Sequence, residues 1–102
     1  MDAKRYTVEF SHKALKELQT ILRDLPEKKL VRKLINAIEN KVQILEYAPR
    51  LYPKIPRMDE LGRSFRKIVL KKYIIFYTID ENRNKLYISH IFYKKSNYFN
   101  KL

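Results

Sequence analysis

The chain has 102 residues, which is enough for one domain and too few for two, so we expect a single domain over residues 1–102. Hydrophobic residues make up 45%, which excludes a wholly disordered chain. The absence of cysteine excludes a disulfide framework and a thiolate metal site. The N-terminal MDAKRYTVEF lacks the apolar run of a signal peptide, and no segment approaches the ~18 apolar residues of a membrane helix. We therefore expect a cytoplasmic protein.

Positive charge is the strongest signal in the composition. Lysine and arginine number 23 against 11 acidic residues, which gives a formal net charge of +12. The excess is uneven, because residues 1–51 hold 11 basic and 7 acidic residues whereas residues 52–102 hold 12 and 4. This distribution favours an anionic partner, such as nucleic acid, the ribosome or an acidic protein segment, over a generic solubilising surface.

The chain begins with a predicted strand and helix. Polar and apolar residues alternate over Arg5–Phe10, as they do in a half-buried strand. Ser11 stands where a helix N-cap is expected. Apolar residues then recur at helical spacing and predict an amphipathic helix over about residues 12–25.

The tetrapeptide DLPE marks the end of the first predicted helix and the start of a second. Pro26 fits the first turn of a new helix, and Asp24 can cap it. Apolar residues at alternating steps of four and three predict a longer second helix over about residues 27–47. Two helices joined by so tight a turn form an antiparallel α-hairpin with one shared apolar side.

The second half is predicted to be a loop followed by β-structure. Residues 48–64 contain three of the four prolines and the only glycine, so we expect an extended loop there. Polar residues 80–84 predict a hairpin turn, and another turn is expected near Lys71–Lys72. Before, between and after these turns, β-branched and aromatic residues predict strands over residues 64–72, 73–79 and 85–93.

These elements predict an α+β fold in a single domain, with the order β-α-α-β-β-β. The last three strands should form an antiparallel meander, and the first strand most simply joins its edge. The α-hairpin would then cover one face of the antiparallel sheet. The opposite face is left without helices, which makes it the candidate working surface.

The segment KKYIIFYTID, which begins at Lys71, places two cations beside aromatic residues. Bases stack on aromatic rings while ammonium groups hold phosphates, so this arrangement is compatible with nucleic-acid binding. The alternative is that the aromatic side chains belong to the core and the lysines to a solvated turn. Core placement is the stronger expectation for Phe76, whereas Tyr73 and Tyr77 fit either alternative.

His90 is the second candidate for chemistry. By a period of two, it is expected to share one strand face with Leu86, Ile88 and Phe92. A histidine can act as a general acid or base near neutral pH, although a lone histidine among apolar neighbours is more often structural. The single glycine excludes a phosphate-binding loop, and a zinc site is improbable without cysteine. We expect no metal and no other cofactor.

The chain resembles the RelE/ParE superfamily of toxins from bacterial type II toxin–antitoxin systems over about residues 6–98. Three blocks carry the resemblance, and the last is the most specific: YTVEFSHKALKEL, VQILEYAPRLYP and SFRKIVLKKYIIFYTIDENRNKLYISHIFYKKSNYF. The resemblance implies the fold derived above and a cognate antitoxin as partner. It also implies one of two activities: RelE-type members cleave mRNA in the ribosome without a metal, and ParE-type members bind and block DNA gyrase.

The sequence departs from the pattern of the nucleases in two places. They have an arginine directly after the tyrosine that opens the central strand, whereas this chain has Ile74. Their last strand often ends in an arginine pair, here replaced by Lys94–Lys95, and lysine lacks the planar fork that clamps phosphate. Ribosome-dependent mRNA cleavage is still the expected activity, with gyrase inhibition as the alternative. The resemblance implies catalytic candidates His90, Tyr93, Lys95 and Tyr98, and nucleic-acid-binding candidates Arg66, Lys71, Lys72 and Lys94.

Overall fold

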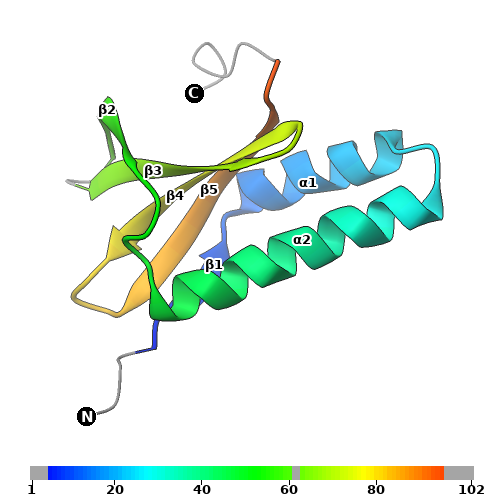
Figure 1. Ribbon diagram of the computed structural model, residues 1–102. Coiled ribbons are helices and arrows are strands. Elements are labelled where there is room, and N and C mark those ends of the chain that lie inside the picture. The colour runs from blue at the N-terminus through cyan, green and yellow to red at the C-terminus, as the bar shows by residue number, and fades with distance from the viewer. Residues whose placement is uncertain (1–4, 61–62, 96–102) are drawn as a thin grey trace.

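The computed structural model describes residues 5–60 and 63–95, which form two helices and a five-stranded sheet (Figure 1). The strands lie in the order β1-β5-β4-β3-β2. Both helices lie on the same side of the sheet and run in opposite directions (Figure 1). The bounds are β1 Thr7–Phe10, α1 His12–Asp24, α2 Lys28–Tyr47, β2 Lys54–Glu60, β3 Arg63–Leu70, β4 Tyr73–Asp80 and β5 Lys85–Tyr93.

The α-hairpin forms as predicted, but its second helix, α2, begins with a different N-cap residue than predicted. The side chain of Ser11 accepts a hydrogen bond from the backbone N–H of Ala14, which confirms Ser11 as the N-cap of α1. Asp24 is the last residue of α1 rather than a cap of α2, and Glu27 holds the N-cap position without a side-chain hydrogen bond. Pro26 therefore lies before α2 and not in its first turn. No helix of the described residues is long and apolar enough to cross a membrane.

The sheet confirms the predicted fold class. β3, β4 and β5 form the antiparallel meander, and β1 joins its edge by pairing with β5 in parallel. A parallel pair needs a long crossover, which the α-hairpin and β2–β4 supply. The turns at Lys71–Lys72 and at residues 81–84 lie where the sequence predicts them.

One predicted loop is in fact a strand. β2 runs through the proline-rich segment and pairs with β3 as the edge strand. Proline excludes a central strand but is tolerated on an edge or at a bulge, and the pairing indeed shifts register between Lys54 and Asp59. Arg57, within that shift, has φ 63°, so the irregular backbone of β2 is concentrated beside Pro56.

The main core lies between the helices and the sheet. Residues from both helices and from β3, β4 and β5 form one cluster, which includes Ile21, Ile38, Ile68 and Tyr77. Tyr77 is fully buried and donates a hydrogen bond to the carbonyl oxygen of Pro49 (2.7 Å). This bond fixes the segment that follows α2 against the sheet.

Burial raises the pKa of Tyr77 to about 12, so stability should depend on this residue at high pH. The unfolded chain loses the phenolic proton near its ordinary pKa of about 10, whereas the folded chain retains it until about 12. The contribution of Tyr77 to the free energy of unfolding is therefore fully present below pH ~10. It falls by about 1.4 kcal/mol per pH unit between pH ~10 and ~12. In urea unfolding, the stability advantage of the wild type over Tyr77→Phe should therefore shrink as the pH rises through this interval. A constant difference would contradict the prediction.

The opposite face of the sheet, called the open face, carries a second apolar cluster. It consists of Ile55, Phe65, Ile74, Phe76 and Phe92, called the open-face cluster. β5 shifts register where Phe76 pairs with His90 and the next residue, Tyr77, pairs with Ile88. The extra residue, Ser89, is a bulge that reverses which face of the sheet the side chains of β5 point to after it. The expectation that His90 shares a face with Leu86 and Ile88 is therefore wrong, because those two lie in the main core.

Candidate functional site

Four exposed lysines gather at one end of the sheet. Lys71 and Lys72 form the turn between β3 and β4, and Lys94 and Lys95 follow β5. The backbone N–H of Lys94 donates to the carbonyl oxygen of Lys72 (2.6 Å), which fixes the two pairs beside each other. We call these four residues the lysine end. The structure thus brings together four predicted site residues that the sequence separates by more than twenty positions.

The backbone at Lys71 is unusual for a lysine. Its φ of 53° lies in the left-handed region, where glycine or asparagine is the ordinary choice. A side chain with a Cβ in this region costs of order 1 kcal/mol. The positive φ follows from the two-residue turn between β3 and β4, because tight hairpin turns require this backbone geometry.

Two tyrosine rings lie beside the lysine end. Tyr73 and Tyr93 pair across β4 and β5, with ring centroids 5.4 Å apart. Tyr73 is buried, and burial, with a smaller contribution from Tyr93, raises its pKa. Tyr93 is 38% exposed and offers an accessible phenol next to Lys94. The combination of an exposed ring and cations is the one that single-stranded nucleic acid requires.

Within residues 5–60 and 63–95, the ion pairs do not involve the lysine end. Its four charges therefore remain available for an external anion. An exposed ion pair would contribute little to stability, whereas clustered unpaired lysines repel one another. This arrangement favours binding over stability.

His90 is buried, and its side chain lies on the open face of the sheet. It is 9% exposed, its ring stacks on Phe92 with centroids 5.1 Å apart, and its Nδ1 is 3.5 Å from a carboxylate oxygen of Glu17. The other oxygen of Glu17 accepts a hydrogen bond from the backbone N–H of Ile91 (3.0 Å). β1 pairs with β5 only as far as Ile88, so the backbone of β5 beyond Ile88 has no strand partner on this side. The carboxylate of Glu17 accepts a hydrogen bond from that unpaired edge and so joins α1 to β5.

Sequence reasoning missed Glu17, although a signal for it exists. Glu17 lies between Ala14 and Ile21 at helical spacing, so a carboxylate interrupts the buried stripe of α1. Such a residue needs a polar partner inside the fold, and His90 and the N–H of Ile91 supply one.

Arg66 does not join the other predicted residues. Its Nη1 donates to the carbonyl oxygens of Tyr52 (2.7 Å) and Arg50 (3.3 Å), on the helix side of the sheet. It is five residues from Lys71 along the same strand and turn, about 16 Å in an extended chain. Tyr98 lies outside the described residues. Among those described, no group of three His, Asp or Glu side chains is arranged to hold a metal ion.

Two helices on one face of a five-stranded sheet (Figure 1) are the fold that the resemblance to the RelE/ParE superfamily implies. The chain belongs to the family described as "ParE toxin of type II toxin-antitoxin system, parDE", whose model matches residues 8–98. No curated protein matches the chain significantly.

Several solved structures share the fold at low sequence identity. A chain of the chromosomal ParDE toxin–antitoxin system from P. aeruginosa has a TM-score of 0.66 and 16% identity, and the match covers 88% of this chain and 97% of that one. A mutant of the E. coli toxin RelE in the free state has a TM-score of 0.65 and 17% identity, with coverage of 95% and 92%. A chain of the M. tuberculosis toxin–antitoxin complex RelBE2 has a TM-score of 0.63 and 20% identity, and the match covers 93% of this chain and 98% of that one. The shared fold thus spans ParE and RelE proteins alike.

Proposed function

We propose that this toxin is a non-catalytic inhibitor that docks through its lysine end on a large target, for which DNA gyrase is the first candidate. The observation that carries the proposal is the environment of Ile74. Its side chain is 4% exposed and lies in the open-face cluster beside Phe76 and Phe92. The resemblance to RelE-type nucleases implies an arginine at this position, directly after the tyrosine that opens the central strand. Here the position is apolar and closed to solvent.

The surroundings of His90 support the same proposal. A general base needs access to the hydroxyl that it deprotonates. The ring of His90 is instead enclosed by Phe65, Phe76 and Phe92 and lies against Glu17. These contacts support a structural role in which His90 and Glu17 hold α1 against β5.

Ribosome-dependent mRNA cleavage is the second candidate, and the lysine end favours it. RNA cleavage of this kind needs cations that stabilise the developing charge on phosphorus, and Lys71, Lys72, Lys94 and Lys95 lie together with the exposed phenol of Tyr93. Under this alternative, Tyr93, Lys95 and Tyr98 would carry out proton transfer, with His90 supporting them. A lysine ammonium binds phosphate as a point charge only, which weakens this alternative relative to an arginine site.

An acidic antitoxin is the partner that the family and the charge both support. The net charge of +12 attracts acidic segments, and the exposed Leu15, Leu30 and Ile44 on the helices offer apolar anchors. A segment that folds on this surface would bury both kinds of group.

Two assays on the purified toxin distinguish the two candidate targets. We expect gyrase supercoiling to be inhibited and mRNA translated in vitro to remain intact in primer extension. The variant His90→Gln, checked for folding by circular dichroism, should retain the inhibition because the histidine takes no part in chemistry. Codon-specific cleavage of the mRNA by the wild type, together with unaffected supercoiling, would overturn the proposal and establish the nuclease, and its loss in His90→Gln would in addition give the histidine a part in the chemistry.

A further inference from the structure

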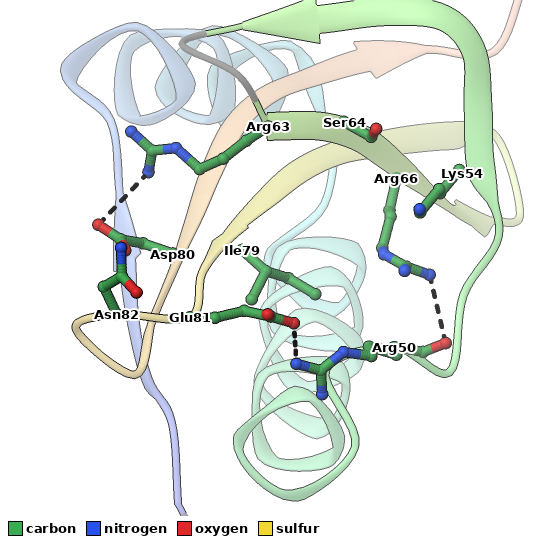
Figure 2. A pocket seen from close by; sticks show the side chains of 9 residues that line it. All are labelled: Arg50, Lys54, Arg63, Ser64, Arg66, Ile79, Asp80, Glu81 and Asn82. Atoms are coloured by element: carbon green, nitrogen blue, oxygen red, sulfur yellow. Dashed lines mark hydrogen bonds and ion pairs between the residues drawn. The ribbon is translucent and has the colours of Figure 1, made fainter.

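A polar hollow of about 670 Å³ lies at the opposite end of β3 from the lysine end (Figure 2). β3 contributes Arg63, Ser64 and Arg66, and the segment after α2 contributes Arg50. Lys54 of β2 stands beside Arg66 (Figure 2). The volume is within the range of ligand-binding sites, about 300–1,000 Å³.

The hollow is a continuation of the helix-covered face. By strand alternation, Ser64 and Arg66 face the same side as Ile68, which belongs to the main core. α2 ends at Tyr47, and the segment after it bends toward the sheet, where Tyr77 holds Pro49. The sheet therefore extends past the end of the helix, and the residues at that end are polar rather than apolar.

Arg66 is fixed and still has donors to offer. Both of its hydrogen bonds within the described residues use Nη1, with the carbonyl oxygens of Arg50 and Tyr52 as acceptors. A guanidinium has five N–H donors, so those on Nη2 and Nε have no acceptor within the described part of the chain. Lys54 likewise forms no ion pair with any side chain that the structure describes. A fixed guanidinium next to a free ammonium is an arrangement suited to a carboxylate or phosphate.

The rim of the hollow carries the opposite charge. Arg50 pairs with Glu81, and Arg63 lies 3.8 Å from Asp80 (Figure 2). The lining thus holds four cations and two carboxylates. A nucleic-acid backbone would bring phosphates against Asp80 and Glu81, which repel them. A peptide can instead place a carboxylate on Arg66 and direct its backbone N–H groups to the acidic rim.

We infer that the hollow is a binding site for an acidic peptide segment, in which a glutamate or aspartate carboxylate binds to Arg66 and Lys54. The antitoxin is the source of such a segment, and this part of the inference rests on the proposed function. The site is separate from the lysine end, so one partner could occupy the hollow while the target-binding lysines are covered or left free.

Titrations followed by nuclear magnetic resonance test the site on the full chain. The signals of the arginine Nε–Hε groups are recorded as three probes are added: a glutamate-rich peptide amide, its glutamine counterpart, and single-stranded oligothymidylate. We expect the glutamate peptide to shift the Arg66 signal and the glutamine peptide to leave it unchanged. Arg66→Gln should weaken peptide binding by about tenfold or more, as the loss of a charge-assisted hydrogen bond implies.

Two further variants separate binding at the hollow from folding and from net charge. Lys54→Gln removes a side chain without a described partner, so it should weaken binding without a change in stability. Lys67→Gln is the matched control, because it removes one charge from the same strand as Arg66 but on the open face, and it should bind as the wild type does. The inference is overturned if Lys67→Gln loses as much affinity as Lys54→Gln, or if oligothymidylate shifts Arg66 at lower concentrations than the peptide. Neither gyrase nor antitoxin enters these titrations, so their outcome is independent of the supercoiling assay.

Discussion

Simultaneous replacement of Lys71, Lys72, Lys94 and Lys95 by glutamine is expected to abolish growth inhibition by the expressed toxin. The four ammonium groups lie together, are exposed and form no ion pair within residues 5–60 and 63–95, so their loss removes a cluster of unpaired positive charge from one end of the sheet. A docking surface that loses four cations should also lose much of the salt dependence of its binding. The affinity for the target should then fall by a factor of ~10² or more at physiological salt.

The matched control has the same change in net charge on another surface. Lys28, Lys29, Arg32 and Lys33 belong to the exposed first turns of α2, where positive charge is unfavourable beside the helix N-terminus. Their replacement by glutamine also lowers the net charge from +12 to +8 and should leave growth inhibition intact. Equal loss in both variants would show that net charge, rather than the lysine end, determines the toxicity. Circular dichroism of both variants establishes that they fold.

The parts of the fold that depend on local pattern follow from the sequence. Ser11, the apolar stripes of α1 and α2, and the turn at Lys71–Lys72 were all predictable, because capping, helical periodicity and strand composition act within a few residues. The lysine end was predictable only in part. The turn lysines and Lys94–Lys95 were identified separately, and the pairing of Tyr73 with Tyr93 determines that they meet.

The features that were not predictable depend on single residues or on distant partners. One extra residue at Ser89 moves His90 to the open face, and no local signal marks that residue. The strand β2 exists because an edge tolerates proline, and the sequence does not reveal which segment becomes an edge. The polar hollow likewise depends on where α2 ends relative to β3, which is a property of tertiary packing.

The open-face cluster connects these features to function. The face without helices was the expected working surface, yet Phe65, Phe76 and Phe92 close its centre. The charged groups that were expected there lie instead at its end, as the lysine end, or on the other face, as Arg66. A protein built in this way can present a basic docking edge without an aqueous catalytic centre.

Ile74→Arg is expected to destabilise the toxin by about 3–5 kcal/mol, because it places an uncompensated charge in the open-face cluster. The side chain of Ile74 is 4% exposed, and the lysine end nearby adds repulsion rather than a partner. Chemical denaturation with circular dichroism as the signal measures the loss directly. Primer extension on translated mRNA should show no cleavage, although this change restores the arginine of the superfamily's ribonucleases.

Val69→Arg provides the control for this last prediction. Val69 pairs directly with Ile74 on the same face of the sheet, but it is 49% exposed. An arginine there can extend into solvent, so the free energy of unfolding should change by no more than about 0.5 kcal/mol. If Ile74→Arg were as mild as Val69→Arg, the open-face cluster could not be a closed apolar centre. If Ile74→Arg also gained codon-specific cleavage, the face would be a nuclease site that lacks one residue, and the docking proposal would fail.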